Sequence, residues 1–388
     1  MKTLFVIDNL FVGGITSSLL NILPHYVKRS DCDLIVFDDR FDGAILPSNV
    51  HAFCPSKLLS ILGNPLSKLK NRPLLFIVKL WLLFLSKVFS GKTARAFLFL
   101  FVRKRYKYDV AISFCHDNGW KSLSKGCNDY VLKKVNASAK ISWIHCDYSS
   151  YGGFDKRDIS KYQNFDYIVN VSESCSKRFC SLFPSLTDKC RVVENFQSNQ
   201  IVKIDHYHEY KENCFNVLTV CRISSVKGLD RAIEAFNKLV QEGLTNFTWT
   251  IVGDGPEKNR LIERVKELSL DSMIAFVGQS DCPQLYMKNA DLFLLPSIHE
   301  AAPMVFGECA QFKLFVLSTN TCSAKELVLD RGIGVVCDNS VEGLYEYLKK
   351  FITKEIIPQN NALYFESYSH AEERLNSFIG EICSKYGY

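Results

Sequence analysis

The 388-residue sequence lacks the patterns that mark several common classes of protein. Its fifteen cysteines include no C-x2-C pair and no companion histidine at a zinc-ligand spacing, which argues against a zinc site. The sequence has no G-x-G-x-x-G dinucleotide signature and no recognisable nucleic-acid-binding motif. We therefore expect no metal ion, no resident cofactor and no nucleic-acid partner.

Long uninterrupted apolar runs are also missing. The longest apolar portion, residues 73–90, contains Lys79 and Lys87. Each lysine at mid-bilayer costs roughly 3 kcal/mol, so a spanning helix is not expected. The N-terminus does not resemble a secretion signal, because Asp8 interrupts a good first strand. Free cysteines in a chain without such a signal indicate a reducing, cytoplasmic environment.

Acidic residues are absent from residues 56–107, although this segment is rich in leucine, phenylalanine, isoleucine and valine. It holds twelve of the 47 basic residues and none of the 41 acidic ones, so this segment alone makes a chain of net charge +6 basic. A basic, apolar, acid-free segment favours a helix lying in the interface of an anionic membrane. Ordinary core helices with solvated lysines are the alternative. The basic residues are Lys57, Lys68, Lys70, Arg72, Lys79, Lys87, Lys92, Arg95, Arg103, Lys104, Arg105 and Lys107.

Short apolar segments alternate with helical stretches along the chain, which predicts parallel sheets with crossover helices. The chain is too long for one ordinary core, so we expect two Rossmann-like α/β domains, residues 1–198 and 199–388. Their boundary is expected in the polar segment 197–213. The expected strands are residues 3–8, 33–37, 109–114, 140–145, 167–172, 191–194, 216–220, 248–253, 274–278, 291–296, 314–319 and 333–337.

Two glutamates, Glu300 and Glu308, follow the expected strand 291–296 with seven residues between them. Pro303 suits the first turn of a helix, which leaves Glu300 in the preceding loop and puts Glu308 just over one turn into the helix. Free N–H groups at a helix start, with a carboxylate on either side, suit a ligand that carries hydroxyl groups. Two solvated carboxylates flanking a helix start are the alternative.

A second candidate is the loop after the expected strand 216–220, which contains Arg222 and Lys227. An amphipathic helix follows it, so both cations lie at the positive end of a helix dipole. Cations are unfavourable there unless an anion is present, and a diphosphate would supply one. A solvated basic loop is the alternative.

These segments resemble the signature of retaining glycosyltransferases of the GT4 type, which have the two-domain GT-B fold. The resemblance rests on the Glu-x7-Glu pattern, on the Arg222–Lys227 loop, which is similar to G-R-L-x-x-x-K-G, and on the VGDGPE turn at 252–257. It is specific only over residues 220–311. It implies two Rossmann-like domains whose parallel sheets face each other across a cleft, and a last helix, near residues 369–386, that packs back on the first domain.

The resemblance also implies roles for individual residues. Glu300 would contact the donor sugar as the catalytic carboxylate, Glu308 would bind the ribose hydroxyls, and Arg222 and Lys227 would hold the diphosphate. The nucleobase would lie at residues 279–283. The remaining donor-binding loop is formed by Ala301, Ala302, Pro303, Met304 and Val305.

The sequence departs from the family at two positions, Cys221 and Ala301, where glycine is usual. Backbone amides of the loop at Ala301 touch the sugar in the family, so its methyl group is expected to narrow the choice of sugar.

In the first half, Gly13 and Gly14 lie between the first strand and a helix, where they permit close approach of a ligand to the backbone. A tight turn is the alternative. His145 ends the strand 140–145, at the edge where open α/β sheets bind ligands. The resemblance implies that the glycine loop lies near the donor phosphates and that His145 contacts the sugar or the reaction centre; a structural histidine is the alternative.

Three further residues, His116, Asp117 and Asp147, follow strands at the same edge and are candidates for the acceptor side.

The predicted function is transfer of a sugar from a nucleotide-diphosphate-sugar donor to a lipid-linked glycan acceptor, with retention implied by the resemblance. Arg222 and Lys227 would stabilise the leaving group without a metal ion. A UDP-sugar is preferred to GDP-mannose because residues 308–311 are similar to those of UDP-sugar users. The expected setting is the inner face of the cell membrane, in assembly of a bacterial capsule, O-antigen or similar glycan. A nucleotide-sugar epimerase of the same fold and a non-catalytic donor-binding membrane scaffold are the alternatives.

Overall fold

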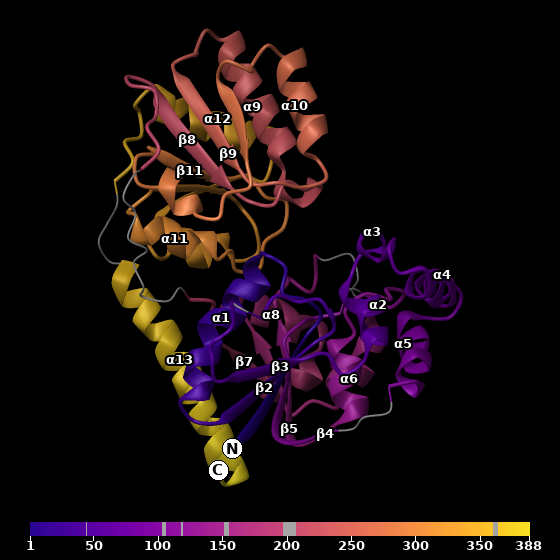
Figure 1. The fold of residues 1–388 in the computed structure, drawn as a ribbon. Helices are drawn as coiled ribbons and strands as arrows, with labels where there is room; N and C mark the ends of the chain where they lie inside the picture. The colour runs from indigo at the N-terminus through magenta and orange to yellow at the C-terminus, as the bar shows by residue number, and fades with distance from the viewer. Residues whose placement is uncertain (44, 103–105, 118, 151–154, 197–206, 360–363) are drawn as a thin grey trace. The chain divides into compact units, whose positions relative to one another are not determined.

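The computed structural model describes residues 1–388 except 44, 103–105, 118, 151–154, 197–206 and 360–363, and describes only the backbone of residues 364–369. The chain divides into two compact units (Figure 1). Unit 1 comprises Met1–Asn195 and Ala371–Tyr388, and unit 2 comprises Phe196–His370. The domain boundary expected after residue 198 lies outside the described residues.

Unit 1 is built on a seven-stranded sheet in which every pair is parallel, in the order β3-β2-β1-β4-β5-β6-β7. Six of these strands overlap the segments expected from the sequence. The expectation missed β3, because an edge strand of four residues, only one of them fully buried, gives too short an apolar pattern. The strands are β1 (Lys2–Ile7), β2 (Asp31–Val36), β3 (Val50–Phe53), β4 (Tyr106–Ser113), β5 (Val135–Ile144), β6 (Tyr167–Asn170) and β7 (Cys190–Val192).

Helices surround this sheet, and the acid-free segment forms several of them. The helices are α1 (Gly14–Val27), α2 (Ser60–Gly63), α3 (Leu66–Leu69), α4 (Pro73–Val88), α5 (Gly91–Leu100), α6 (Cys127–Lys134), α7 (Ile159–Tyr162) and α8 (Glu173–Leu182), with 3₁₀ turns η1 (Lys57–Leu59), η2 (Lys156–Asp158) and η3 (Pro184–Lys189). Among the described residues, no helix combines the length and apolar character needed to cross a membrane.

The last helix, α13 (Tyr364–Tyr386), contributes its residues from Ala371 onward to unit 1. Phe378 presents its ring to Trp143 and Tyr167, with centroid distances of 6.4 and 5.4 Å. Arg191 adds a forked ion pair to Glu381, with nitrogen–oxygen distances of 3.0 and 2.6 Å. Figure 1 shows α13 running beside α1.

Unit 2 is built on a six-stranded parallel sheet in the order β10-β9-β8-β11-β12-β13, and all six strands overlap expected segments. Both faces are covered, because successive strand residues join different cores: Val217 packs with α9 and α12, and Leu218 packs with α11. The elements are β8 (Phe215–Val220), β9 (Phe247–Val252), β10 (Ile274–Gly278), β11 (Leu292–Leu295), β12 (Val316–Thr319), β13 (Gly334–Cys337), α9 (Leu229–Gln241), α10 (Lys258–Glu267), α11 (Val305–Gln311) and α12 (Val341–Ile352), with the short turns η4 (Ser225–Lys227), η5 (Pro283–Tyr286) and η6 (Lys325–Leu329).

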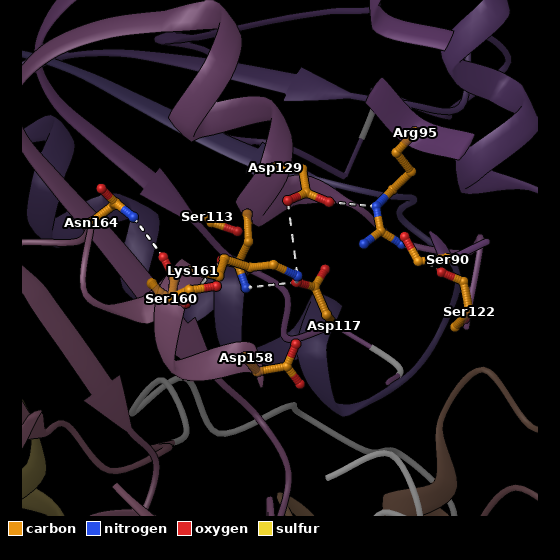
Figure 2. Close-up of polar contacts among 12 residues, drawn as sticks. Ser90, Arg95, Ser113, Asp117, Ser122, Asp129, Asp158, Ser160, Lys161 and Asn164 are labelled. Carbon is orange, nitrogen blue, oxygen red and sulfur yellow. Dashed lines mark hydrogen bonds and ion pairs between the residues drawn. The ribbon is translucent and has the colours of Figure 1, made fainter. Parts of the chain in front are cut away.

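A buried chain of charges fastens the helices of unit 1 together (Figure 2). Arg95 on α5 contacts Asp129 on α6 at 2.6 Å, and Lys161 on α7 lies 3.9 Å from Asp129 and 2.5 Å from Asp117. All four side chains are at most 6% exposed. Because removing one member leaves the others charged and without solvent, this network fixes α5, α6 and α7 against the loop after β4.

Asp129→Asn tests this network. The substitution leaves Arg95 and Lys161 buried with less compensating charge, so unit 1 should lose about 3–5 kcal/mol of unfolding free energy. Glu173→Gln is the control, because its ion pair with Arg374 is nearly half exposed and should contribute about 1 kcal/mol or less. Urea unfolding followed by circular dichroism measures both; equal losses would contradict the role given to the buried network.

Candidate functional site

The central contact of unit 2 is an ion pair between Lys227 and Glu300. Lys227 ends the η4 turn after β8, and Glu300 follows β11, the neighbouring strand. The Lys227 Nζ atom lies 2.5 Å from Glu300 Oε1, and the Ser297 hydroxyl donates to the same oxygen at 2.6 Å. The two charged residues that the sequence placed in separate motifs are therefore in direct contact.

This pair is largely shielded from water, with side-chain exposures of 24% for Lys227 and 11% for Glu300. Burial acts to lower the pKa of Lys227, but the attraction and hydrogen bond of Glu300 outweigh it and leave that pKa above its usual value. Lys227 is therefore a cation throughout the physiological range, held in place before any ligand arrives.

The loop that carries Glu300, residues 296–300, is fixed by side chains from other elements. The backbone N–H of Ile298 donates to the carbonyl of Val226 at 2.8 Å, which joins this loop to the one that carries Lys227. Three successive carbonyls of the loop also accept hydrogen bonds, Pro296 from Arg231 (2.7 Å), Ser297 from Thr319 (2.6 Å) and Ile298 from Asn339 (3.0 Å). Sequence reasoning missed Arg231, Thr319 and Asn339, since they belong to no local motif.

Gly228 lies at the junction of the two loops and directly precedes α9. Its φ of 62° is in the left-handed region, and a Cβ there would lie 2.2 Å from the carbonyl oxygen of Pro296. Only glycine permits this approach. The glycine after Lys227 is thus explained by the packing of the two loops against each other.

Arg222 behaves differently from Lys227. Its side chain is exposed and makes no hydrogen bond or ion pair with any residue that the structure describes. The backbone around it is fixed by the turn after β9, because Cβ atoms on Gly253 and Gly255 would lie 1.9 and 2.1 Å from the carbonyls of Cys221 and Ile223. The VGDGPE turn therefore supports the loop of Arg222.

Glu308 lies in the first turn of α11, which begins at Val305. The expected start at Pro303 is therefore two residues early, although a turn begins there, with the Phe306 N–H donating to the Pro303 carbonyl at 3.3 Å. Gln284 of η5 donates to Glu308 Oε2 at 3.5 Å. Gln284 follows the loop 279–283 and was also missed by sequence reasoning.

The donor loop between the two glutamates is only partly accessible. Ala301 is buried at 9% exposure, while Ala302, Pro303, Met304 and Val305 are half-buried. The methyl group of Ala301 therefore belongs to the packed side of the loop. The roles implied for these five residues stay predictions.

In unit 1, Gly13 and Gly14 are exposed between β1 and α1. Gly13 has an extended backbone (φ 162°). A Cβ atom added to it would lie 4.0 Å from the nearest atom, the carbonyl oxygen of Phe11. Neither strain nor close packing within unit 1 requires glycine at position 13. Room for a ligand remains the physical reason for a glycine there, and this role stays a prediction.

His145 follows the last residue of β5, and its ring packs against that of Phe114 in a tilted arrangement, with a centroid distance of 4.6 Å. Burial, with a smaller effect of Lys125, lowers the pKa of His145 to about 3. Its Nε2 atom is buried and has no hydrogen-bond partner among the described residues. His145 is therefore neutral near pH 7, able to donate or accept one hydrogen bond but not to act as a charged acid.

The three acceptor-side candidates have structural partners. Asp117 belongs to the buried charge network, and the attraction of Lys161 and Arg95 outweighs burial and holds its pKa below the usual value. His116 Nε2 lies 2.9 Å from Lys125 Nζ. Asp147 accepts hydrogen bonds from Ser149, Ser150 and Arg178, each at 2.6 Å. Asp117 and Asp147 are thus explained by local structure.

Metal-binding side chains do not cluster in the described part of the chain. No group of three or more His, Cys, Asp or Glu residues there has a geometry that could hold a metal ion.

The amino-acid sequence is similar to those of known glycosyltransferases. Residues 203–369 match the family described as "Glycosyl transferases group 1". An uncharacterized glycosyltransferase of Methanocaldococcus jannaschii is 25% identical over 283 residues, which cover 69% of each chain. The lipopolysaccharide glucosyltransferase WaaG of Escherichia coli K12 is 36% identical over 132 residues, 33% of this chain and 34% of that protein. These matches span from about a third to about two thirds of the relatives' own lengths.

Among solved structures, HepE of Anabaena in complex with UDP-glucose aligns with 99% of this chain and 100% of its own, with a TM-score of 0.63 and 19% identity. At this identity the likeness establishes the fold alone. The expected GT-B fold class is confirmed.

Gly228→Ala tests the packing of the two loops. The left-handed conformation costs about 1–2 kcal/mol for alanine, and the clash with the Pro296 carbonyl adds to it. Gly243→Ala is the matched control, because Gly243 has a φ of 83° but nothing within 4 Å of an added Cβ. Urea unfolding should show a clearly larger loss for Gly228→Ala; similar losses would mean that the contact is not needed.

Acid titration tests the buried His145. Above pH 6.5 both the folded and the unfolded chain hold the imidazole neutral, so its contribution to stability is complete. As pH falls from 6.5 towards 3, only the unfolded chain takes up the proton, and stability declines by up to about 1.4 kcal/mol per pH unit. His145→Asn should show a shallower decline of unfolding free energy between pH 7 and 5 than wild type and the control His51→Asn. Identical slopes would contradict the buried neutral imidazole.

Proposed function

We propose that this chain, which carries a Glycosyl transferases group 1 domain on a GT-B fold, transfers a sugar from a nucleotide-diphosphate-sugar donor with retention of configuration. The observation that carries the proposal is the half-buried contact of Lys227 with Glu300 at 2.5 Å. A cation for the diphosphate and a carboxylate for the sugar are thereby held at one point on unit 2.

The charged residues have complementary tasks in this proposal. Lys227, together with the exposed Arg222, stabilises the negative charge that builds on the departing nucleoside diphosphate. This electrostatic stabilisation needs no metal ion. Glu308 accepts hydrogen bonds from the ribose hydroxyls, with Gln284 beside it, and the loop 301–305 lines the sugar.

Glu300 has two hydrogen-bond partners on one oxygen, Lys227 and Ser297. Its other oxygen, Oε2, is the one we assign to the donor sugar. Because Lys227 and the loop carbonyls hold Glu300 in position before binding, little reorganisation is needed when the donor arrives. Glu300 is therefore proposed as the catalytic carboxylate.

For unit 1, taken by itself, we propose two further roles. Gly13 and Gly14 leave room for phosphate groups at the start of α1, and His145, neutral near pH 7, offers one uncharged hydrogen bond to a sugar.

We propose a UDP-sugar as donor and a lipid-linked glycan as acceptor. HepE, whose fold this chain shares, is described in complex with UDP-glucose. Several similar proteins are named for surface glycans, among them WaaG and the putative colanic acid biosynthesis glycosyltransferase WcaL of Escherichia coli. The proposed setting is synthesis of a bacterial surface polysaccharide, such as a capsule or O-antigen, at the cytoplasmic face of the cell membrane.

Nucleotide binding tests the donor site. In a thermal-shift panel of UDP, GDP, ADP and their sugars, UDP at 100 times its dissociation constant should stabilise the protein by about 2.7 kcal/mol. Lys227→Ala and Glu308→Gln should lose the shift, because they remove the diphosphate and ribose contacts.

The matched controls are Lys238→Ala and Glu342→Gln, which remove an exposed ion pair of the same unit. Both controls should keep the wild-type shift. If no nucleotide stabilises the wild-type protein, or if the site variants and the controls behave alike, the proposed donor site is wrong.

A further inference from the structure

Exposed apolar side chains gather on α4 and α5. Of the seventeen large hydrophobic residues that are exposed in the described part of the chain, ten lie between Leu74 and Phe101. Their exposed fractions range from 39% for Phe97 to 72% for Leu74 and Leu100. Soluble monomers seldom leave a contiguous apolar patch of this kind in water, so we expect this face to bind a partner.

The inward side of helix α4 holds two polar residues beside Leu75 and Leu82, and its outward side is mostly apolar. The inward side includes Lys79, whose Nζ donates to the carbonyls of Ile61 (2.8 Å) and Asn64, and Ser86, which donates to Leu83 at 2.8 Å. The outward stripe repeats every three or four residues and consists of Leu74, Ile77, Trp81, Phe84 and Val88. Rotating the helix to bury this stripe would remove Lys79 from its carbonyls, so the outward orientation is fixed.

Helix α5 extends the same face. The ring of Trp81 contacts Phe97 edge-on at 4.9 Å between centroids, and Phe97 contacts Phe101 at 5.3 Å. Figure 1 shows the two helices side by side at one edge of unit 1. On its inner side α5 is anchored by the buried contact of Arg95 with Asp129, so the pair forms a rigid apolar surface.

The charged residues that the segment 56–107 itself contributes are all basic. No acidic residue occurs from 56 to 107, and Lys87 is exposed and Lys92 half-buried on the same helices. Three cations that the sequence assigned to a basic surface are used elsewhere: Lys79 and Arg95 are buried, and Arg72 pairs with Asp39 at 2.6 Å. Arg103, Lys104 and Arg105 lie outside the described residues. This surface therefore offers a partner more apolar contact than charge.

We propose that the outward face of α4 and α5 inserts into the interface of a bilayer that contains anionic lipids. The apolar side chains enter the boundary between head groups and acyl chains, while Lys87 and Lys92 meet the lipid phosphates. A second copy of this chain fits less well, because pairing two such faces would bring these lysines together with no acid in the segment. The inference supplies a membrane surface for the proposed lipid-linked acceptor, but it does not depend on donor binding.

Vesicle flotation and fluorescence test the proposal. The protein should float with phosphatidylcholine–phosphatidylglycerol vesicles, and Trp81 fluorescence should be quenched by lipids brominated on their acyl chains. Trp81→Phe should remove most of this quenching, because Trp143 and Trp249 are fully buried and Trp120 lies under Arg157. Ile77→Ser combined with Phe84→Ser should weaken vesicle binding at least about tenfold. The double variant should keep the wild-type melting temperature and nucleotide response.

The control replaces two exposed apolar residues of unit 2, Leu329→Ser with Ile357→Ser, and should bind vesicles as wild type does. Absence of flotation by the wild-type protein overturns the proposal. Binding that survives Ile77→Ser with Phe84→Ser but is lost in Lys87→Glu with Lys92→Glu also overturns it, since charge alone would then hold the protein. So does a dimer in sedimentation equilibrium that the apolar variants dissociate, since the face would then join two copies.

Discussion

The ion pair of Lys227 with Glu300 is the contact on which the proposed donor site depends. It joins the loops that follow two adjacent strands, β8 and β11, and both residues are mostly buried. A pair of this kind stabilises little by itself, because desolvation offsets most of the attraction. Its value is positional, because each residue holds the other in place. The surrounding contacts of Gly228, Arg231 and Asn339 serve the same end, since they fix the backbone from which the pair extends.

The two units use buried charge for different purposes. In unit 2, Lys227 of the Lys227–Glu300 pair shares the segment after β8 with the exposed Arg222, at the end of the sheet where parallel strands bind ligands. In unit 1 the buried charges of Arg95 and Asp129 hold helices together, and no ligand is needed to explain them. This internal network also sets the orientation of α5, whose outer side carries part of the exposed apolar face. In unit 1, the buried contact of Arg95 with Asp129 therefore helps to keep the apolar side of α5 exposed.

The sequence predicted the regular part of the fold well, because twelve of thirteen strands are apolar segments bounded by polar or turn residues. It missed β3, a short edge strand with little apolar pattern. For the proposed site it singled out Lys227 and Glu300, which are in contact in the structure, and their roles stay predictions. It missed Thr319 and Asn339, whose partners lie about 20 to 40 positions away in the chain, because a single sequence does not reveal such pairings.

The orientation of the side chains in the basic segment 56–107 could not be predicted from the sequence either. Composition identified residues 56–107 as basic and apolar, but composition does not tell which side chains face outward. The structure turns Lys79 inward and Trp81 outward on the same helix, against the usual order of polar and apolar residues. The orientation depends on tertiary hydrogen bonds to carbonyls from α2 and the residue that follows it, and these bonds have no signature in the local sequence.

A crystal structure of the protein with UDP and with an intact UDP-sugar is the most direct measurement of the central claim. The account predicts the diphosphate on Arg222 and Lys227, the ribose on Glu308, and the sugar against Glu300, with the loops of unit 2 essentially unmoved. A nucleotide bound elsewhere, or a donor that leaves Lys227 and Glu300 without ligand contact, would contradict it.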